Sequence, residues 1–104
     1  MLRGDIYALK LRGRGHEQQG RHYGVVVQSS AMLPRSTVIL APTSTGALPS
    51  SFRPEIEIDE VPTKVLVEHL GAVDMSRLGD FAGHASPEEM WGIDDSLRAV
   101  LGLR

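Results

Sequence analysis

The chain has 104 residues, of which 41% are hydrophobic and 23% charged, and its formal net charge is -2 at pH 7. This length predicts one domain, residues 1–104, with a modest core. The chain has no cysteine, which excludes disulfides and thiolate metal sites, and no apolar run approaches the roughly 18 residues of a membrane span. We therefore expect a soluble, cytoplasmic protein that does not enter membranes.

Strands are predicted in the first half of the chain, over residues 5–10, 23–28 and 37–41. The second follows a polar loop punctuated by glycine, and the third is dense in β-forming residues. Residues 46–51 contain Gly, Pro and Ser, which is typical of a flexible loop. This half is therefore expected to be mainly β.

Two more strands are predicted in the second half. Residues 55–59 alternate between acidic residues and isoleucine, which is typical of a half-exposed antiparallel strand. We expect Pro62 to end this segment and residues 64–70 to form a strand buried on both faces. Residues 74–78 are then expected to form a short capped helical turn that Gly79 ends.

A helix is predicted at the C-terminal end. Ser86, Pro87 and Glu89 form the pattern of a capping box with proline at the first helical position. Apolar residues then recur at helical spacing at Met90, Ile93, Leu97, Val100 and Leu101. Trp91 lies at the edge of this stripe, and we expect it to pack in the core rather than contact a partner. Several short strands and one helix predict a small, strongly curved antiparallel sheet or barrel, covered on one side by the helix.

Charge is distributed unevenly between the two halves. Residues 1–53 hold seven Lys and Arg against two acids, a balance of +5, whereas residues 54–104 hold four against eleven, a balance of -7. A positive patch gathers phosphates even when the whole chain is mildly acidic. The alternative is a solvated basic loop with no binding role, and charge alone does not separate the two.

Polar residues gather at two predicted strand ends. Residues 15–24 are crowded with ionisable groups and lead into the strand at residues 23–28, and the strand at residues 37–41 leads into Thr43, Ser44 and Thr45. Binding and catalytic groups are commonly held at the ends of rigid strands. We expect a surface site where these ends meet. No metal is expected there, because the chain lacks cysteine and its four histidines are scattered.

The order of these segments is informative over nearly the whole chain. The segments that carry it are residues 3–7, residues 15–28 with the Glu17-Gln18 pair, residues 37–45, residues 55–59 and residues 67–78. In this order they resemble the MazF/PemK family of toxins from bacterial toxin–antitoxin systems. The resemblance implies an α+β protein that is mainly β, with an SH3-like barrel of antiparallel strands as in MazF, PemK and CcdB toxins and a C-terminal helix. It also implies a homodimer and a MazE-like antitoxin peptide as partner.

The activity that the resemblance implies is a metal-independent endoribonuclease without a cofactor, acting on short sequences in single-stranded RNA. In this reaction the 2'-hydroxyl attacks the adjacent phosphate and leaves a 2',3'-cyclic phosphate. The reaction needs a base, an acid and donors for the developing negative charge. The catalytic candidates are Glu17, Arg21, His22 and Ser44. The RNA-binding candidates are Lys10, Arg12, Arg14, Gln18, Tyr23, Thr43, Thr45 and His69.

Each catalytic candidate has a chemical reason. Arg21 can clamp a phosphate with its planar guanidinium, and His22 can carry a proton near neutral pH. Glu17 can act as the base or orient Arg21. The hydroxyl of Ser44 can hydrogen-bond the scissile phosphate.

The chain departs from the family pattern at three places. His22 and Tyr23 stand where members usually carry Arg-Pro, Ser44 stands where they carry threonine, and residues 69–71 replace Gln-Ile-Arg. Arg21 lies one position early, and neighbouring strand side chains point to opposite faces. The alternative function is therefore a catalytically degenerate or non-enzymatic toxin of the same barrel that binds a protein target.

Overall fold

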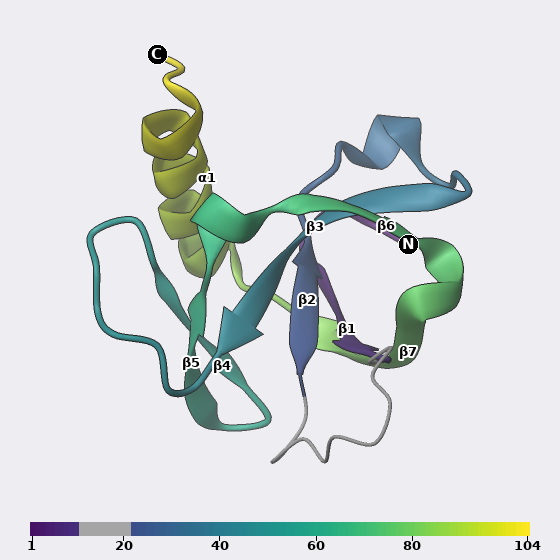
Figure 1. The fold of residues 1–104 in the computed structure, drawn as a ribbon, viewed down its shortest axis with the longest axis horizontal. Helices are drawn as coiled ribbons and strands as arrows, with labels where there is room; N and C mark the ends of the chain where they lie inside the picture. The colour runs from purple at the N-terminus through teal and green to yellow at the C-terminus, as the bar shows by residue number, and fades with distance from the viewer. Residues whose placement is uncertain (11–21) are drawn as a thin grey trace.

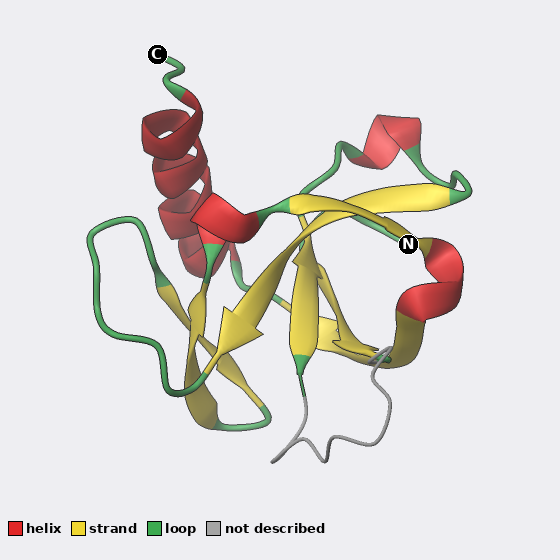
Figure 2. Cartoon of the chain, in the orientation of Figure 1, coloured by secondary structure: helices red, strands yellow, loops and turns green. Residues whose placement is uncertain are grey.

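The computed structural model describes residues 1–10 and 22–104, and Figures 1 and 2 show the chain as a ribbon. Its strands are β1 (Asp5–Leu9), β2 (Tyr23–Val26), β3 (Thr37–Ser44), β4 (Glu55–Ile58), β5 (Val61–Val65), β6 (Gly71–Asp74) and β7 (Leu78–His84). Short 3-10 helices are η1 (Ser30–Met32), η2 (Val67–His69) and η3 (Met75–Arg77), and α1 (Pro87–Leu101) closes the chain. Within this described part, no helix is both long and apolar enough to cross a membrane.

All the strands belong to one curled antiparallel sheet. Its order is β4-β5-β3-β2-β1-β7. The edge of β3 that faces away from β2 pairs with β6 along its first half and with β5 at its end. The helix α1 packs against η2 and beside the sheet (Figure 1). The predicted fold class, a mainly β protein with a small curved sheet and a C-terminal helix, is confirmed.

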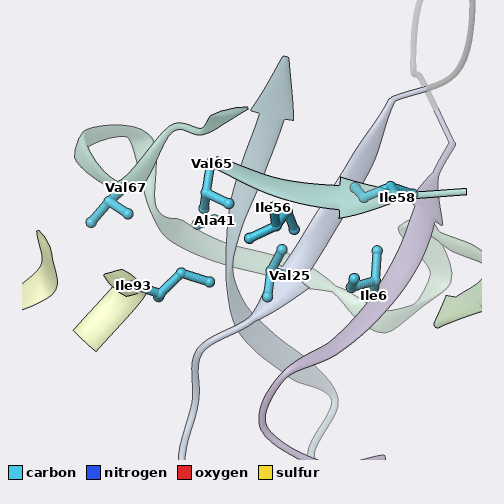
Figure 3. Packing of buried hydrophobic residues seen from close by; sticks show 8 residues of the cluster. All are labelled: Ile6, Val25, Ala41, Ile56, Ile58, Val65, Val67 and Ile93. Carbon is cyan, nitrogen blue, oxygen red and sulfur yellow. The ribbon is translucent and has the colours of Figure 1, made fainter. Parts of the chain in front are cut away.

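A single buried cluster joins the sheet to the helix. Figure 3 shows its members, Ile6, Val25, Ala41, Ile56, Ile58, Val65, Val67 and Ile93, all at most 4% exposed. A second cluster of Val26, Val38 and Leu40 lies apart from the first. Because strand side chains alternate, the sheet buries apolar residues on both faces and holds its strand ends rigidly.

The hairpin between β4 and β5 differs from the prediction around Pro62. The alternation in residues 55–59 is confirmed, with both isoleucines buried. The strand ends at Ile58 and turns through Asp59 and Glu60, whose φ angles are +55° and +68°. Pro62 does not end a segment but lies inside β5 opposite Glu57. The prediction for Pro62 was therefore wrong. The turn at Asp59 and Glu60 reverses the chain before it reaches Pro62.

The predicted strand over residues 64–70 is also wrong beyond Val65. The backbone N–H of Leu66 donates to the carbonyl of Pro42 at 2.8 Å, but proline has no N–H with which to return the bond. The β3–β5 ladder ends there, and η2 follows with Val67 buried. The edge of β3 then pairs with β6, from Thr37 opposite Asp74 to Leu40 opposite Gly71.

The C-terminal helix begins as predicted. Ser86 Oγ accepts a hydrogen bond from the Glu89 N–H at 3.1 Å, and Glu89 Oε1 accepts one from the Ser86 N–H at 2.8 Å. Trp91, however, is 65% exposed, so its predicted core position is wrong. Trp91 and Ile93 are two positions apart, and such residues point about 200° apart around a helix axis. Trp91 therefore points away from the face that buries Ile93.

The turn before β7 is partly as predicted. Asp74 caps η3 through the N–H of Ser76 at 2.8 Å. Gly79 does not end the turn, because Leu78 is its cap and Gly79 already belongs to β7. An added Cβ at Gly79 would lie 3.3 Å from the carbonyl oxygen of Ala8, so this position brings β7 close to β1.

Candidate functional site

The two polar strand ends lie side by side. Antiparallel pairing of β2 and β3 places Gly24 opposite Pro42. One residue further on, Thr43 Oγ1 donates a hydrogen bond to the Tyr23 carbonyl at 3.1 Å. Thr43 is only 5% exposed, so its hydroxyl ties β3 to β2. The start of β2 and the end of β3 therefore form one continuous surface.

Ser44 is the last residue of β3 and is paired with Lys64 of β5. Directly opposed residues in an antiparallel pair have their side chains on the same face, so a hydroxyl and an ammonium group are neighbours. Ser44 Oγ accepts a hydrogen bond from the Gly46 N–H at 3.2 Å. The nearest carboxylate oxygen recorded for Lys64 Nζ is Oε1 of Glu55 at 3.6 Å, which is a loose ion pair.

Lys64 was missed in the sequence prediction. Its segment was expected to be a strand, but which residue it faces depends on the register between β3 and β5. No local pattern in residues 61–65 marks that register. Thr45 was named in the sequence prediction, unlike Lys64. It lies exposed in the bend just after β3, next to Ser44 in the chain.

His22 and Tyr23 form the other side of the site. The carbonyl of His22 accepts a hydrogen bond from the Leu9 N–H at 2.8 Å, which anchors the start of β2 to the end of β1. Both residues are partly buried. Tyr23, one of the RNA-binding candidates, packs against the main core cluster and also lines a cavity.

Several predicted residues lie outside the described part of the chain. These are Glu17 and Arg21 among the catalytic candidates, and Arg12, Arg14 and Gln18 among the RNA-binding candidates. Lys10 is described and exposed just after β1. Its N–H donates to the Arg77 carbonyl at 2.8 Å, and Arg77 Nε donates to the Lys10 carbonyl at 3.2 Å. A second cationic residue therefore lies beside Lys10.

His69 is not brought to the meeting point of the two strand ends. It lies in η2, along the edge of β3 opposite to β2, and its side chain is 59% exposed. Its Nε2 is 3.6 Å from Glu68 Oε2. The expectation that His69 ends a strand was wrong, because the strand ends before η2; its role in RNA binding stays a prediction.

The Arg53–Glu68 ion pair holds the loop that follows β3. Arg53 Nη2 is 2.6 Å from Glu68 Oε2, and Arg53 Nη1 donates to the Leu48 carbonyl at 3.0 Å. The hydrogen bond from Arg53 lowers the pKa of Glu68, although burial opposes the shift. Glu68 therefore stays ionised and keeps the loop beside Ser44 in place. Among the described residues, no group of three or more His, Asp or Glu is placed to hold a metal ion.

Sequence comparisons place these features in a known family. A family model described as a PemK-like, MazF-like toxin of a type II toxin–antitoxin system matches residues 2–101. A relative from Mycobacterium tuberculosis, named "Putative toxin Rv3098A/RVBD_3098A", is 35% identical in an alignment of 106 positions that covers 99% of each chain.

Solved structures share the fold. An endoribonuclease in complex with its cognate antitoxin, from a mycobacterial species, has a TM-score of 0.82 and 21% identity over 100% of this chain and 97% of its own. MazF from Deinococcus radiodurans has a TM-score of 0.77 and 22% identity over 99% of this chain and 97% of its own. At 21% and 22% identity, these two structural similarities show that the chains share a fold.

Proposed function

Since the chain belongs to the PemK-like, MazF-like toxins of type II toxin–antitoxin systems, we propose that it is a metal-independent endoribonuclease that cleaves single-stranded RNA. One observation carries the proposal. Ser44 lies between Lys64 on one neighbouring strand and the start of β2 on the other. A hydroxyl donor and a cation beside a polar strand end suit a phosphodiester that gains negative charge during cleavage.

The proposed reaction is an internal transfer within the RNA. The 2'-oxygen forms a bond to phosphorus while the bond to the 5'-oxygen breaks, and a 2',3'-cyclic phosphate remains. A base takes the 2'-hydroxyl proton, and an acid gives a proton to the departing 5'-oxygen. We assign the Ser44 hydroxyl to donate to a non-bridging phosphate oxygen and the Lys64 ammonium to offset its charge.

The proton transfers are assigned to the β2 side of the site. His22 precedes β2, and an imidazole can take or give a proton near neutral pH. Arg21 keeps its predicted role as phosphate clamp, and Glu17 keeps its predicted role as the base or as the residue that orients Arg21. Lys10 and Arg77 lie together at the end of β1 and are suited to sequence-independent phosphate contacts.

The proposed partners follow from the same family. Solved neighbours include an endoribonuclease with its cognate antitoxin and MazE–MazF from Deinococcus radiodurans. We propose that this chain likewise binds an antitoxin peptide that blocks its RNA site, forms a homodimer and acts in the cytoplasm.

The test is incubation of the purified protein with a long RNA in excess EDTA. We expect specific fragments that end in 2',3'-cyclic phosphate. These ends can be ligated to an adaptor only after the cyclic phosphate has been opened and then removed by a phosphatase, which identifies them. Intact RNA at every salt concentration would overturn the proposal. It would favour the alternative of a non-enzymatic toxin, which the replacement of Arg-Pro by His22 and Tyr23 already suggests.

A further inference from the structure

A cavity lies beside the start of β2, where Tyr23 forms part of its wall. Its volume is about 260 Å³, and it is lined by Tyr23, Ile58, Asp59, Asp80, Phe81 and Ala82. These residues come from the start of β2, the β4–β5 turn and the middle of β7, where the two ends of the curled sheet approach each other. The hydrogen bond from Thr43 Oγ1 to the Tyr23 carbonyl joins the cavity-lining Tyr23 to the residue that precedes Ser44 in β3.

The size of the cavity suits a single nucleobase. Pockets for drug-sized ligands have volumes of roughly 300–1,000 Å³, so a slightly smaller cavity accommodates a ring system rather than a larger ligand. Ile58 belongs to the main core cluster, and Tyr23 and Ala82 pack against it. These three residues give the cavity an apolar part that the core fixes in place, which suits the flat face of a base.

Two carboxylates provide the polar groups of the cavity. Asp59 and Asp80 are both exposed, and within the described residues neither has a hydrogen bond or ion pair recorded for its side chain. Two negative charges repel a phosphate group. They instead favour a neutral ligand that presents N–H donors, because hydrogen bonds to a charged acceptor are the strong ones.

The backbone conformation at Asp59 is one that residues with a side chain rarely adopt. Asp59 and Glu60 have φ angles of +55° and +68° in the two-residue turn between β4 and β5. Turns of this kind favour Asn-Gly, since both residues need positive φ. Strained backbone is often retained at functional sites. A side chain with a carboxylate at this position is therefore consistent with a role in binding.

We propose that this cavity binds a guanine base of the RNA, next to the linkage that is cut. Guanine presents two adjacent donors on its Watson–Crick edge, N1–H and N2–H, and one carboxylate can accept both. Adenine and cytosine place an acceptor nitrogen beside their amino group, and uracil has one N–H between two carbonyls. Guanine therefore fits an acidic cavity best.

The inference rests on the proposed function, but its first test does not require cleavage. The isotope-labelled protein is titrated with guanosine, adenosine, cytidine and uridine while backbone amide resonances are followed. We expect guanosine to shift the amides of Ile58 and of residues 80–82 and the other nucleosides to have little effect. Asp59→Asn and Asp80→Asn should each weaken guanosine binding about tenfold or more.

Glu60→Gln is the matched control. It removes the same charge from the same turn, at a residue that does not line the cavity, and should leave guanosine binding unchanged. Asn tolerates positive φ well, so Asp59→Asn should fold normally. No guanosine-dependent shifts, equal shifts for all four nucleosides, or equal binding by the Asp59→Asn, Asp80→Asn and wild-type proteins would overturn the inference.

A second test maps the cleavage sites on a long RNA. We expect guanine at one constant position near the cut, and we expect Asp59→Asn and Asp80→Asn to relax that preference while Glu60→Gln keeps it. Specific cleavage without a guanine preference would overturn the guanine cavity and leave the nuclease intact. Selective guanosine binding together with uncut RNA would overturn the nuclease and support the base site.

Discussion

The two ends of β1 differ in how their polar groups are used. At its start, which we call the N-terminal clamp (Arg3, Asp5, His84 and Asp94), polar and charged groups bind one another closely. Asp5 Oδ1 is 2.7 Å from His84 Nδ1, and Arg3 Nη2 is 2.7 Å from Asp94 Oδ1. The other end of β1 is bound to the residue before β2, toward the candidate site. There Lys64 of β5 has only a loose ion pair, with Glu55, at 3.6 Å.

This difference separates structural from functional polar groups. In the N-terminal clamp the polar groups satisfy one another's hydrogen bonds, and burying such groups stabilises a fold only when they are paired. At the candidate site, Ser44 is paired with Lys64, and the start of β2 lines a cavity whose carboxylates, Asp59 and Asp80, have no partner among the described residues. Groups in that state are available to a ligand. Substitutions at the two ends should therefore affect different properties.

The largest effect is expected for Ser44→Ala on RNA cleavage. Loss of one donor to a developing negative charge typically lowers the rate about 10²- to 10³-fold. The free energy of unfolding should change by less than about 0.5 kcal/mol, as for most surface substitutions. Initial cleavage rates and urea denaturation measure the two quantities.

Ser51→Ala is the control for Ser44→Ala. Ser51 lies exposed in the following loop, and its substitution should leave both the cleavage rate and the stability at wild-type values. A Ser44→Ala protein that loses stability but cleaves at the normal rate would show that Ser44 belongs with the structural groups.

The next largest effect is expected for Asp5→Asn on stability. Asp5 is 8% exposed and accepts hydrogen bonds from the Leu2 N–H at 2.8 Å and from His84. Loss of the charged acceptor should lower the free energy of unfolding by about 1–3 kcal/mol at pH 7. Cleavage per folded molecule should not change, because the substitution lies at the other end of β1.

The effect of Asp5→Asn should depend on pH. Burial raises the pKa of Asp5, but hydrogen bonds from His84 and Leu2 and nearby positive charge together lower it below 3.8. A carboxylate with a lowered folded-state pKa stabilises the fold above its unfolded value and loses that contribution as the pH falls through the folded value. The stability gap to wild type should therefore narrow in urea titrations below pH 3.8. A gap that stays constant would contradict the clamp.

The smallest effect is expected for Ser86→Ala, at the start of α1. Loss of the side chain that caps the Glu89 N–H should cost about 1 kcal/mol and lower the melting temperature in a circular-dichroism scan. Ser86→Asp keeps an acceptor at this position and should restore most of the loss. Equal melting temperatures for Ser86→Ala and wild type would show that the cap is not needed once α1 packs on the sheet.

Much of the fold was predictable because its signals are local. The alternation in residues 55–59 and the capping box at Ser86 each depend on residues within a few positions of one another, and both are confirmed. Other elements depend on distant contacts. The strand expected over residues 64–70 stops at Val65 because Pro42, far away in the chain, cannot return a hydrogen bond to Leu66.

The candidate site follows the same division. The amino-acid sequence by itself determined which residues carry ionisable and hydroxyl groups, where the helix begins and to which toxin family the order of motifs belongs. Only the tertiary structure decided that Lys64 faces Ser44, that Trp91 points to solvent and that Asp59 and Asp80 share a cavity with Tyr23. The reason is physical: side-chain type and short-range pattern are local, whereas strand register and the curl of a sheet arise from contacts between segments far apart in the chain.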